Sequence, residues 1–290
     1  MGSRAAVIVS GGGSISPFTT PSAGCAVGLE AGGTDTALRG ALLDAGVEVY
    51  TAPVTVGAGT AAEDPGWAGF ADPPLVLPAD LTINSVGEVE ESAARLARFL
   101  IHLHAEYGVQ EVDIVAHSLG GVFARSAHMQ LRDAKAPVAV VSLTSIGTPW
   151  LGSFVRHFEL ESMPMPEPAA SYAFSIMRHM RQGGRLVAAA DAQPLWSAGK
   201  EHGLDGLALT RIAGTYFTGE GEPYPHDGMA SRASVFATDA DPVVFPRAAC
   251  HEVPDVHSIY FAREMDLPWE RSITWDPAVL DLVVEAVQSA

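Results

Sequence analysis

The sequence predicts a single α/β domain with a mostly parallel central sheet and helices on both faces. Two observations predict it: continuous apolar runs alternate along the chain with segments of helical periodicity, and the runs end in glycine or small polar residues. The chain has 290 residues, which is enough for one such domain with an insertion. Because ligands of parallel sheets bind at the carboxyl ends of the strands, we expect the functional site at that edge.

Strands are predicted where apolar residues run on without a helical period, as in buried parallel strands. These runs are residues 5–10, 47–54, 111–118, 137–146, 207–217 and 247–253. Helices are predicted where apolar residues recur every three or four positions. These segments are residues 36–46, 93–104, 119–131 and 276–287.

The ends of two of these helices carry capping signals. Ser85 and Glu88 fit the S-x-x-E capping box, which predicts the start of the helix that includes residues 93–104. Asp276 and Pro277 fit the N-cap and first position of the last helix.

Two segments interrupt the alternation of strands and helices. Residues 57–82 are rich in Gly, Pro and Ala and are expected to form a long surface excursion. Residues 154–205 are rich in Met, Phe and Pro and are expected to form an inserted cap or lid on the domain. The apolar side chains of this cap would line a pocket for an apolar ligand or pack the cap onto the body.

The charge of the chain excludes some classes of partner. Its net charge of -17 would repel nucleic acid and anionic bilayers, so we expect a neutral or apolar ligand. No apolar run is long enough to span a membrane, so no integral membrane association is expected. No signal peptide is visible, which favours a cytoplasmic location, whereas a removed signal would mean secretion.

The cysteines and histidines do not form a metal-ligand pattern, so no metal site is expected. Cys25 and Cys250 are far apart in sequence, and two ordinary thiols or one long-range disulfide both remain open. Residues 11–13 are three glycines after the first predicted strand. They lack the G-x-G-x-x-G spacing and the directly following helix of a dinucleotide site, so no nucleotide cofactor is expected.

The strongest functional motif is VDIVAHSLGGVFAR, residues 112–125, where a predicted strand turns into a helix at Ser118. Such a turn exposes the serine hydroxyl and aims the free N–H groups of the helix at the same point. It needs small residues two positions before and after the serine, which are Ala116 and Gly120, and Gly121 adds clearance. The context predicts a nucleophile, the alternative being a serine that only begins a helix.

The AHSLGG segment resembles the nucleophile turn of bacterial lipases and esterases of the α/β-hydrolase superfamily. The resemblance extends to IGTPWLGS, residues 146–153, and to HDGMASRAS, residues 226–234. It implies the α/β-hydrolase fold and a serine hydrolase that cleaves small-molecule or lipid carboxylic esters, without a cofactor.

The same resemblance implies the acid of a Ser-His-Asp triad. Asp227 lies in a segment similar to the lipase D-G-x-x-S motif, where the acid holds the imidazole tautomer and stabilises the imidazolium. The alternative is an ordinary Asp-Gly turn, with Asp239 or Asp241 as the acid instead.

The triad histidine is expected after the acid in chain order. His257 follows the predicted strand at residues 247–253, in the loop where a base reaches the serine, and the lipases have a histidine at this point. His251 lies within that strand and remains the alternative. His226 adjoins Asp227 and is expected to pack its loop.

The oxyanion hole needs two backbone donors. Leu119, directly after the nucleophile, is the first, and aligning VIVSGGG with the lipase V-H-G-x loop makes Gly12 the second. Ser10 stands where those lipases carry histidine, which leaves the second donor open by one residue. Contacts with the substrate are expected from four further residues: Gly11, His117, Trp150 and Met177.

These inferences predict a lipase or carboxylesterase that works through an acyl-enzyme. An acyltransferase or a thioesterase with the same triad is the nearest alternative. A non-catalytic binding protein on the same fold is the alternative from another class.

Overall fold

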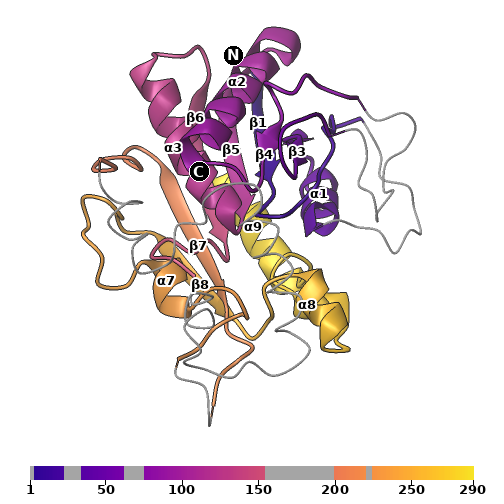
Figure 1. Ribbon diagram of the computed structural model, residues 1–290, viewed down its shortest axis with the longest axis vertical. Coiled ribbons are helices and arrows are strands. Elements are labelled where there is room, and N and C mark those ends of the chain that lie inside the picture. The colour runs from indigo at the N-terminus through magenta and orange to yellow at the C-terminus, as the bar shows by residue number, and fades with distance from the viewer. Residues whose placement is uncertain (1–2, 23–33, 62–74, 154–198, 220–223) are drawn as a thin grey trace.

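A computed structural model describes residues 3–22, 34–61, 75–153, 199–219 and 224–290. Within them, six strands form one sheet in the order β2-β1-β5-β6-β7-β8, and every neighbouring pair is parallel. Figure 1 labels five of these strands, from β1 to β8. The strands are β1 (Ser3–Val9), β2 (Val49–Thr51), β5 (Val109–His117), β6 (Ala139–Ile146), β7 (Ala208–Gly214) and β8 (Ala249–Val253). The predicted parallel sheet is confirmed.

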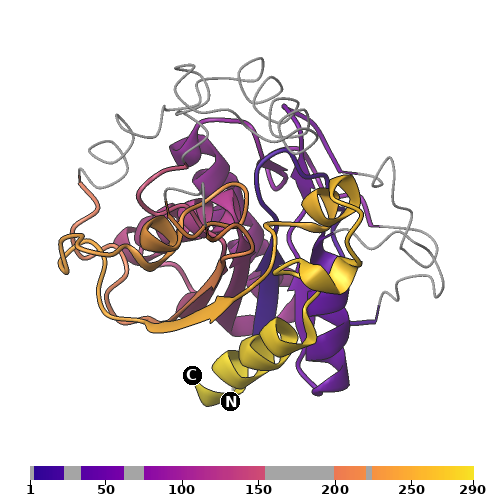
Figure 2. The same ribbon diagram turned by 90° about the horizontal axis from the view of Figure 1, so that it is seen from below.

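Helices cover both faces of the sheet, as predicted (Figure 2). One face carries α2 (Val89–Tyr107) and α3 (Leu119–Asp133), which pack against each other. The other face carries α1 (Thr34–Asp44) and α9 (Pro277–Ser289), which also pack against each other. Alternate residues of β1 divide between the two cores because successive strand side chains point to opposite faces: Val7 packs with the α2 and α3 side and Ile8 with the α1 and α9 side.

Several short elements were not predicted. They are β3 (Val54–Thr55), β4 (Ile83–Asn84), α7 (Arg232–Phe236), α8 (Ile259–Glu264) and the 3-10 turn η1 (Trp269–Arg271). Strands β3 and β4 pair with each other outside the main sheet. Two to six residues are too few to display a period, so the sequence pattern carries no signal for them.

The predicted capping box before α2 is wrong. The N-cap residue is Glu88, and its side chain makes no capping hydrogen bond with the described residues. The hydroxyl of Ser85 instead donates to the carbonyls of Ser14 and Thr55, at 3.1 and 3.0 Å. A contact with a distant loop has therefore replaced the local cap. At the last helix, Asp276 accepts a hydrogen bond from the amide of Ala278 at 2.8 Å, as its cap signal predicted.

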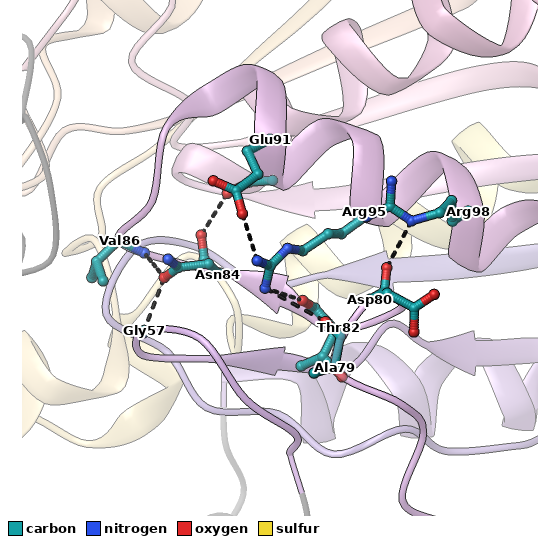
Figure 3. Close-up of polar contacts among 10 residues, drawn as sticks. Gly57, Ala79, Asp80, Thr82, Asn84, Val86, Glu91, Arg95 and Arg98 are labelled. Atoms are coloured by element: carbon teal, nitrogen blue, oxygen red, sulfur yellow. Dashed lines mark hydrogen bonds and ion pairs between the residues drawn. The ribbon is translucent and has the colours of Figure 1, made fainter.

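Side chains of α2 hold the segment that leads into it (Figure 3). Arg95 donates to the carbonyl of Thr82 at 3.3 Å and pairs with Glu91 at 2.5 Å, while Arg98 donates to the carbonyl of Asp80 at 2.9 Å. The side-chain oxygen of Asn84 accepts the amide of Gly57 at 3.0 Å. The described ends of the predicted surface excursion are thus tied to the body of the domain.

The predicted cap, residues 154–205, lies outside the described residues except for turns at 199–205, and Met177 lies outside them as well. Cys25 also lies outside them, and Cys250 is an exposed free thiol. Over the described ranges, no helix is long and apolar enough to cross a membrane.

Candidate active site

Ser118 occupies the corner between β5 and α3 in a strained backbone conformation. Its φ of 53° and ψ of -129° lie in a region that residues other than glycine rarely adopt. The amide of Ser118 donates to the carbonyl of Ile146 at 2.8 Å, and its own carbonyl accepts the amide of Gly121 at 3.2 Å. The neighbouring strand and the first turn of the helix therefore hold the strained corner in place.

The small residues after Ser118 are required by close approaches of other chain segments. A Cβ on Gly120 would collide with the carbonyls of Val9 and Ser10 at the end of β1. A Cβ on Gly121 would collide with the side chain of Thr148. The helix can begin directly after the serine only because these two positions lack side chains.

The structure brings Ser118, His257 and Asp227 together in one chain of contacts. Nε2 of His257 lies 3.0 Å from Oγ of Ser118, and Nδ1 lies 2.6 Å from Oδ2 of Asp227. A carboxylate only accepts hydrogen bonds, so Nδ1 carries the imidazole proton. The unprotonated Nε2 is then the acceptor for the serine hydroxyl, which is the arrangement of a general base.

Asp227 is fully buried and is itself held by the backbone. Its second oxygen, Oδ1, accepts the amides of Met229 at 2.8 Å and Ala230 at 2.7 Å, which leaves Oδ2 for His257. The carbonyl of Asp227 also accepts the amide of His257 at 2.8 Å. The two residues are thus joined through both their backbones and their side chains.

Two glycines that the sequence reasoning did not single out make room for this pair. Gly147 has a φ of 59°, and a Cβ there would lie 3.1 Å from Nδ1 of His257. A Cβ on Gly214, the last residue of β7, would lie 2.8 Å from Cβ of Asp227. Glycines at the carboxyl ends of neighbouring strands were the available signal.

The alternative acids and bases make other contacts. His251 lies in β8 and pairs with Ile212 of β7. Asp241 accepts the amide of Val243 within a local turn, at 2.9 Å. His226 stacks on Phe217 with ring centroids 4.9 Å apart, which is the loop packing expected of it.

The glycine loop after β1 lies directly against Ser118. A Cβ on Gly11 would lie 2.5 Å from Cβ and 3.3 Å from Oγ of Ser118. Gly12 follows in the turn, and Leu119 begins α3, where an amide lacks a partner within the helix. Both predicted oxyanion donors therefore belong to segments that adjoin Ser118, while Gly11 gives clearance for the serine side chain.

Two predicted substrate contacts are packing residues in the structure. His117 is 4% exposed, and its Nε2 donates to the carbonyl of His257 at 2.9 Å. Trp150 is 1% exposed and lies in the core beside Phe245 and the guanidinium of Arg125. Both side chains are therefore buried by the described chain, and their contact with substrate stays a prediction.

The six-stranded parallel sheet, the helices on both faces and the strained serine at the end of β5 are features of the α/β-hydrolase fold. Residues 80–192 match the family model described as "Putative serine esterase (DUF676)", which covers Ser118 but ends before Asp227 and His257. No curated protein matches the chain in sequence.

Solved structures with the same fold include a lipase, BlEst2 of Bacillus licheniformis in its mature form, at 12% identity and a TM-score of 0.50 over 96% of this chain and 91% of that chain. The product of the gene lin2722 of Listeria innocua is similar at 13% identity and a TM-score of 0.52, over 99% of this chain and 94% of that one. A metagenomic carboxyl esterase, MGS0156, is similar at 13% identity and a TM-score of 0.53, over 100% of this chain and 76% of that one. The fold and the family match together support serine hydrolase activity.

Proposed function

We propose that the protein hydrolyses carboxylic esters, as a lipase or carboxylesterase, with Ser118 as nucleophile, His257 as base and Asp227 as the orienting acid. The observation that carries the proposal is the contact chain from Oγ of Ser118 through both ring nitrogens of His257 to Asp227, with steps of 3.0 and 2.6 Å. The family match over residues 80–192 supports the serine, and the esterases among the fold neighbours support the substrate class.

In the proposed reaction, Oγ of Ser118 attacks the ester carbonyl carbon while Nε2 of His257 takes the hydroxyl proton. The carbonyl oxygen becomes an oxyanion, to which the amides of Gly12 and Leu119 donate hydrogen bonds. The intermediate expels the alcohol, which receives the proton from His257, and Ser118 is left acylated. Water then attacks the acyl group by the same route, with His257 as base, and releases the carboxylic acid.

Asp227 keeps its charge throughout this cycle and stabilises the imidazolium that forms twice per turnover. Its two backbone partners, the amides of Met229 and Ala230, hold the carboxylate in the required direction. The composition of residues 154–205, rich in Met and Phe, supports a cap that accepts an apolar acyl chain, with Met177 among its contacts.

The decisive experiment is hydrolysis of p-nitrophenyl esters from acetate to palmitate, with Ser118→Ala as the blank. We expect turnover by the wild-type protein and a loss of about 10⁶-fold in kcat in the variant, because the nucleophile is gone. A fluorophosphonate probe should label the wild-type protein and not Ser118→Ala. Equal labelling of both proteins, or of neither, would instead support a non-catalytic binding protein.

The same assay separates hydrolysis from transfer. When an alcohol is added, a hydrolase should still release mainly the free acid, whereas an acyltransferase should make mainly the new ester. Thioester substrates at matched chain length test the thioesterase alternative in the same way.

Variants of the proposed base and acid test their roles separately. His257→Ala should lose nearly all ester turnover, whereas His251→Ala, in β8, should stay near the wild-type value. Asp227→Asn should lower kcat by about 10⁴-fold while the fold is kept, since an amide no longer holds the productive tautomer. Turnover that survives in His257→Ala but not in His251→Ala would contradict the assignment, and circular dichroism would verify that each variant is folded.

A further inference from the structure

Ser10, Ser16 and Asp35 form a buried polar cluster at the base of the glycine loop, here called the loop clamp. Oγ of Ser10 donates to Oδ2 of Asp35 at 2.5 Å, and Oγ of Ser16 donates to the same oxygen at 2.6 Å. Ser10 is 0% exposed, and Ser16 and Asp35 are each 7% exposed. One carboxylate oxygen thus joins two residues that lie six positions apart and closes the loop between them.

Helix α1 provides the clamp and braces the chain just beyond it. Asp35 lies in the first turn of α1, where the helix dipole stabilises a negative charge. One turn later, the guanidinium of Arg39 donates to Oγ1 of Thr19 at 3.2 Å and to the carbonyl of Thr20 at 2.6 Å. The segment from Ser10 to Thr20 is therefore hydrogen-bonded to α1 at two places, Asp35 and Arg39.

Other contacts hold the far side of the loop. The backbone of Ser16 pairs in both directions with Val54, at 2.9 and 2.7 Å, and the hydroxyl of Ser85 donates to the carbonyl of Ser14 at 3.1 Å. Between Ser10 and Ser14, however, the chain is three glycines, which have no side chains to restrict their backbone. The position of this glycine stretch therefore depends on how its base is fixed.

A shift at the base of the loop would reach the nucleophile directly. Gly11, bonded to Ser10, is the residue whose added Cβ would lie 2.5 Å from Cβ of Ser118. Gly12, the next residue, holds the amide that we propose as an oxyanion donor. The residue directly before Gly11 is Ser10, whose hydroxyl bonds to the buried carboxylate of Asp35.

We infer that Asp35 is a positioning residue that, through Ser10 and Ser16, holds the glycine loop at the distance from Ser118 at which it stabilises the oxyanion. The inference rests on the proposed function. Because the oxyanion exists only in the transition state and the tetrahedral intermediates, the clamp acts on kcat and not on substrate binding.

The test compares Asp35→Ala, Ser10→Ala and Ser16→Ala with the wild-type protein on one p-nitrophenyl ester. Removal of a whole oxyanion donor costs about 10²–10³-fold in kcat, so a donor that is only loosened should cost about 10–100-fold. We expect that loss for Asp35→Ala, with KM changed by less than about threefold, and smaller losses for each serine variant.

A second readout is the affinity for a trifluoromethyl ketone inhibitor. A catalytic serine adds to the carbonyl carbon of this ketone, and the adduct carries a tetrahedral oxyanion. Across the variants, the loss in affinity for this inhibitor should parallel the loss in kcat/KM, as expected for a group that stabilises the transition state. A role in folding alone would not produce this correlation.

Leu38→Ala is the matched control. Leu38 lies in α1, as Asp35 does, but it packs in the hydrophobic core that β1 and α9 share with α1. It should lower the unfolding temperature while kcat and inhibitor affinity stay within about twofold of the wild-type values. If Asp35→Ala does not fold, the kcat of Ser16→Ala tests the inference, since this variant removes one hydroxyl and keeps the carboxylate.

Three results would overturn the positioning role of Asp35 and leave the proposed function standing. The first is that Asp35→Ala and Ser16→Ala fold and keep kcat within about twofold of the wild-type value. The others are a rise in KM at constant kcat, and a loss of kcat without a loss of inhibitor affinity. A wild-type protein that neither cleaves esters nor reacts with a fluorophosphonate would overturn the proposed function and, with it, the clamp.

Discussion

At the scale of single residues, His257 is held by hydrogen bonds at all four of its polar groups. Its amide donates to the carbonyl of Asp227, its carbonyl accepts Nε2 of His117, and its ring nitrogens contact Asp227 and Ser118. Burial, together with the charge interaction with nearby His257, lowers the pKa of His117 to about 3, although the hydrogen bond to the carbonyl of His257 acts in the opposite direction. His117 therefore stays neutral and acts only as a donor.

His117→Phe tests this support. It leaves the carbonyl of His257 buried without its donor, which should lower the free energy of unfolding by about 1–3 kcal/mol and lower kcat. The pH profile of kcat/KM should keep the same acid limb, because a group with a pKa of about 3 does not titrate between pH 5 and 9. Urea unfolding and steady-state assays measure both, and an acid limb that loses one ionisation in the variant would contradict the prediction.

The residue scale also shows which parts of the site the sequence can predict. Ser118 was found from a local pattern, and Asp227 and His257 from motifs that resemble those of lipases. The loop clamp was missed because its members are 6 to 25 positions apart and are residue types that usually lie at the surface. No periodicity or motif marks a serine whose hydroxyl bonds to a buried carboxylate on another element.

At the scale of elements, the space around a glycine in a helix decides whether its replacement by alanine stabilises or destabilises the protein. Alanine usually stabilises a helix relative to glycine by about 1 kcal/mol. In the first turn of α3, a Cβ on Gly120 would instead meet the backbone carbonyls of Val9 and Ser10. The backbone cannot rotate away as a side chain can, so alanine at this position should lower the free energy of unfolding instead of raising it.

Gly120→Ala and Gly40→Ala form a matched pair for this effect. Gly40 lies inside α1, and nothing approaches its added Cβ within 4 Å. We expect Gly40→Ala to raise the free energy of unfolding by about 0.5–1 kcal/mol and Gly120→Ala to lower it by about 1–3 kcal/mol. Urea unfolding of both variants measures the difference, and equal effects of the same sign would refute the packing argument.

The long elements were predictable because their cause is local. The strands β1, β5 and β6 are buried on both faces and are therefore continuous apolar runs, and α2 and α9 have a regular apolar face. The predicted capping box at the start of α2 was wrong because the hydroxyl of Ser85 bonds to the carbonyl of Ser14, 71 positions away. Strands such as β3 and β4 owe their existence to pairing and not to their two-residue sequences.

At the scale of the whole molecule, Asp255 links the loop of His257 to the last helix and makes stability depend on pH. Asp255 is 1% exposed and accepts a hydrogen bond from Arg271 at 3.0 Å. Burial, helped by the carboxyl of Asp276 and opposed by Arg271, raises the pKa of Asp255 to about 7. Between about pH 4 and 7 the folded chain thus keeps a proton that the unfolded chain has released.

The contribution of Asp255 to the free energy of unfolding should therefore be largest below pH 4, fall as the pH rises to 7 and stay constant above it. Asp255→Asn keeps the shape of the neutral carboxyl without ionising. We expect the variant to gain stability relative to the wild-type protein when the pH is raised from 5 to 8, as measured by urea unfolding at both values. A difference that stays constant or falls with pH would show that Asp255 does not titrate in this range.

The position of β1 inside the sheet, between β2 and β5, has a consequence for the nascent chain. Its partner on one side, β2, follows soon after it, but its partner on the other side, β5, is synthesised about 100 positions later. At about 5–20 residues per second, β1 waits roughly 5–20 s on the ribosome with one edge open. An apolar strand with an open edge pairs readily with other chains, so β1 is a point at which slow or crowded synthesis favours aggregation.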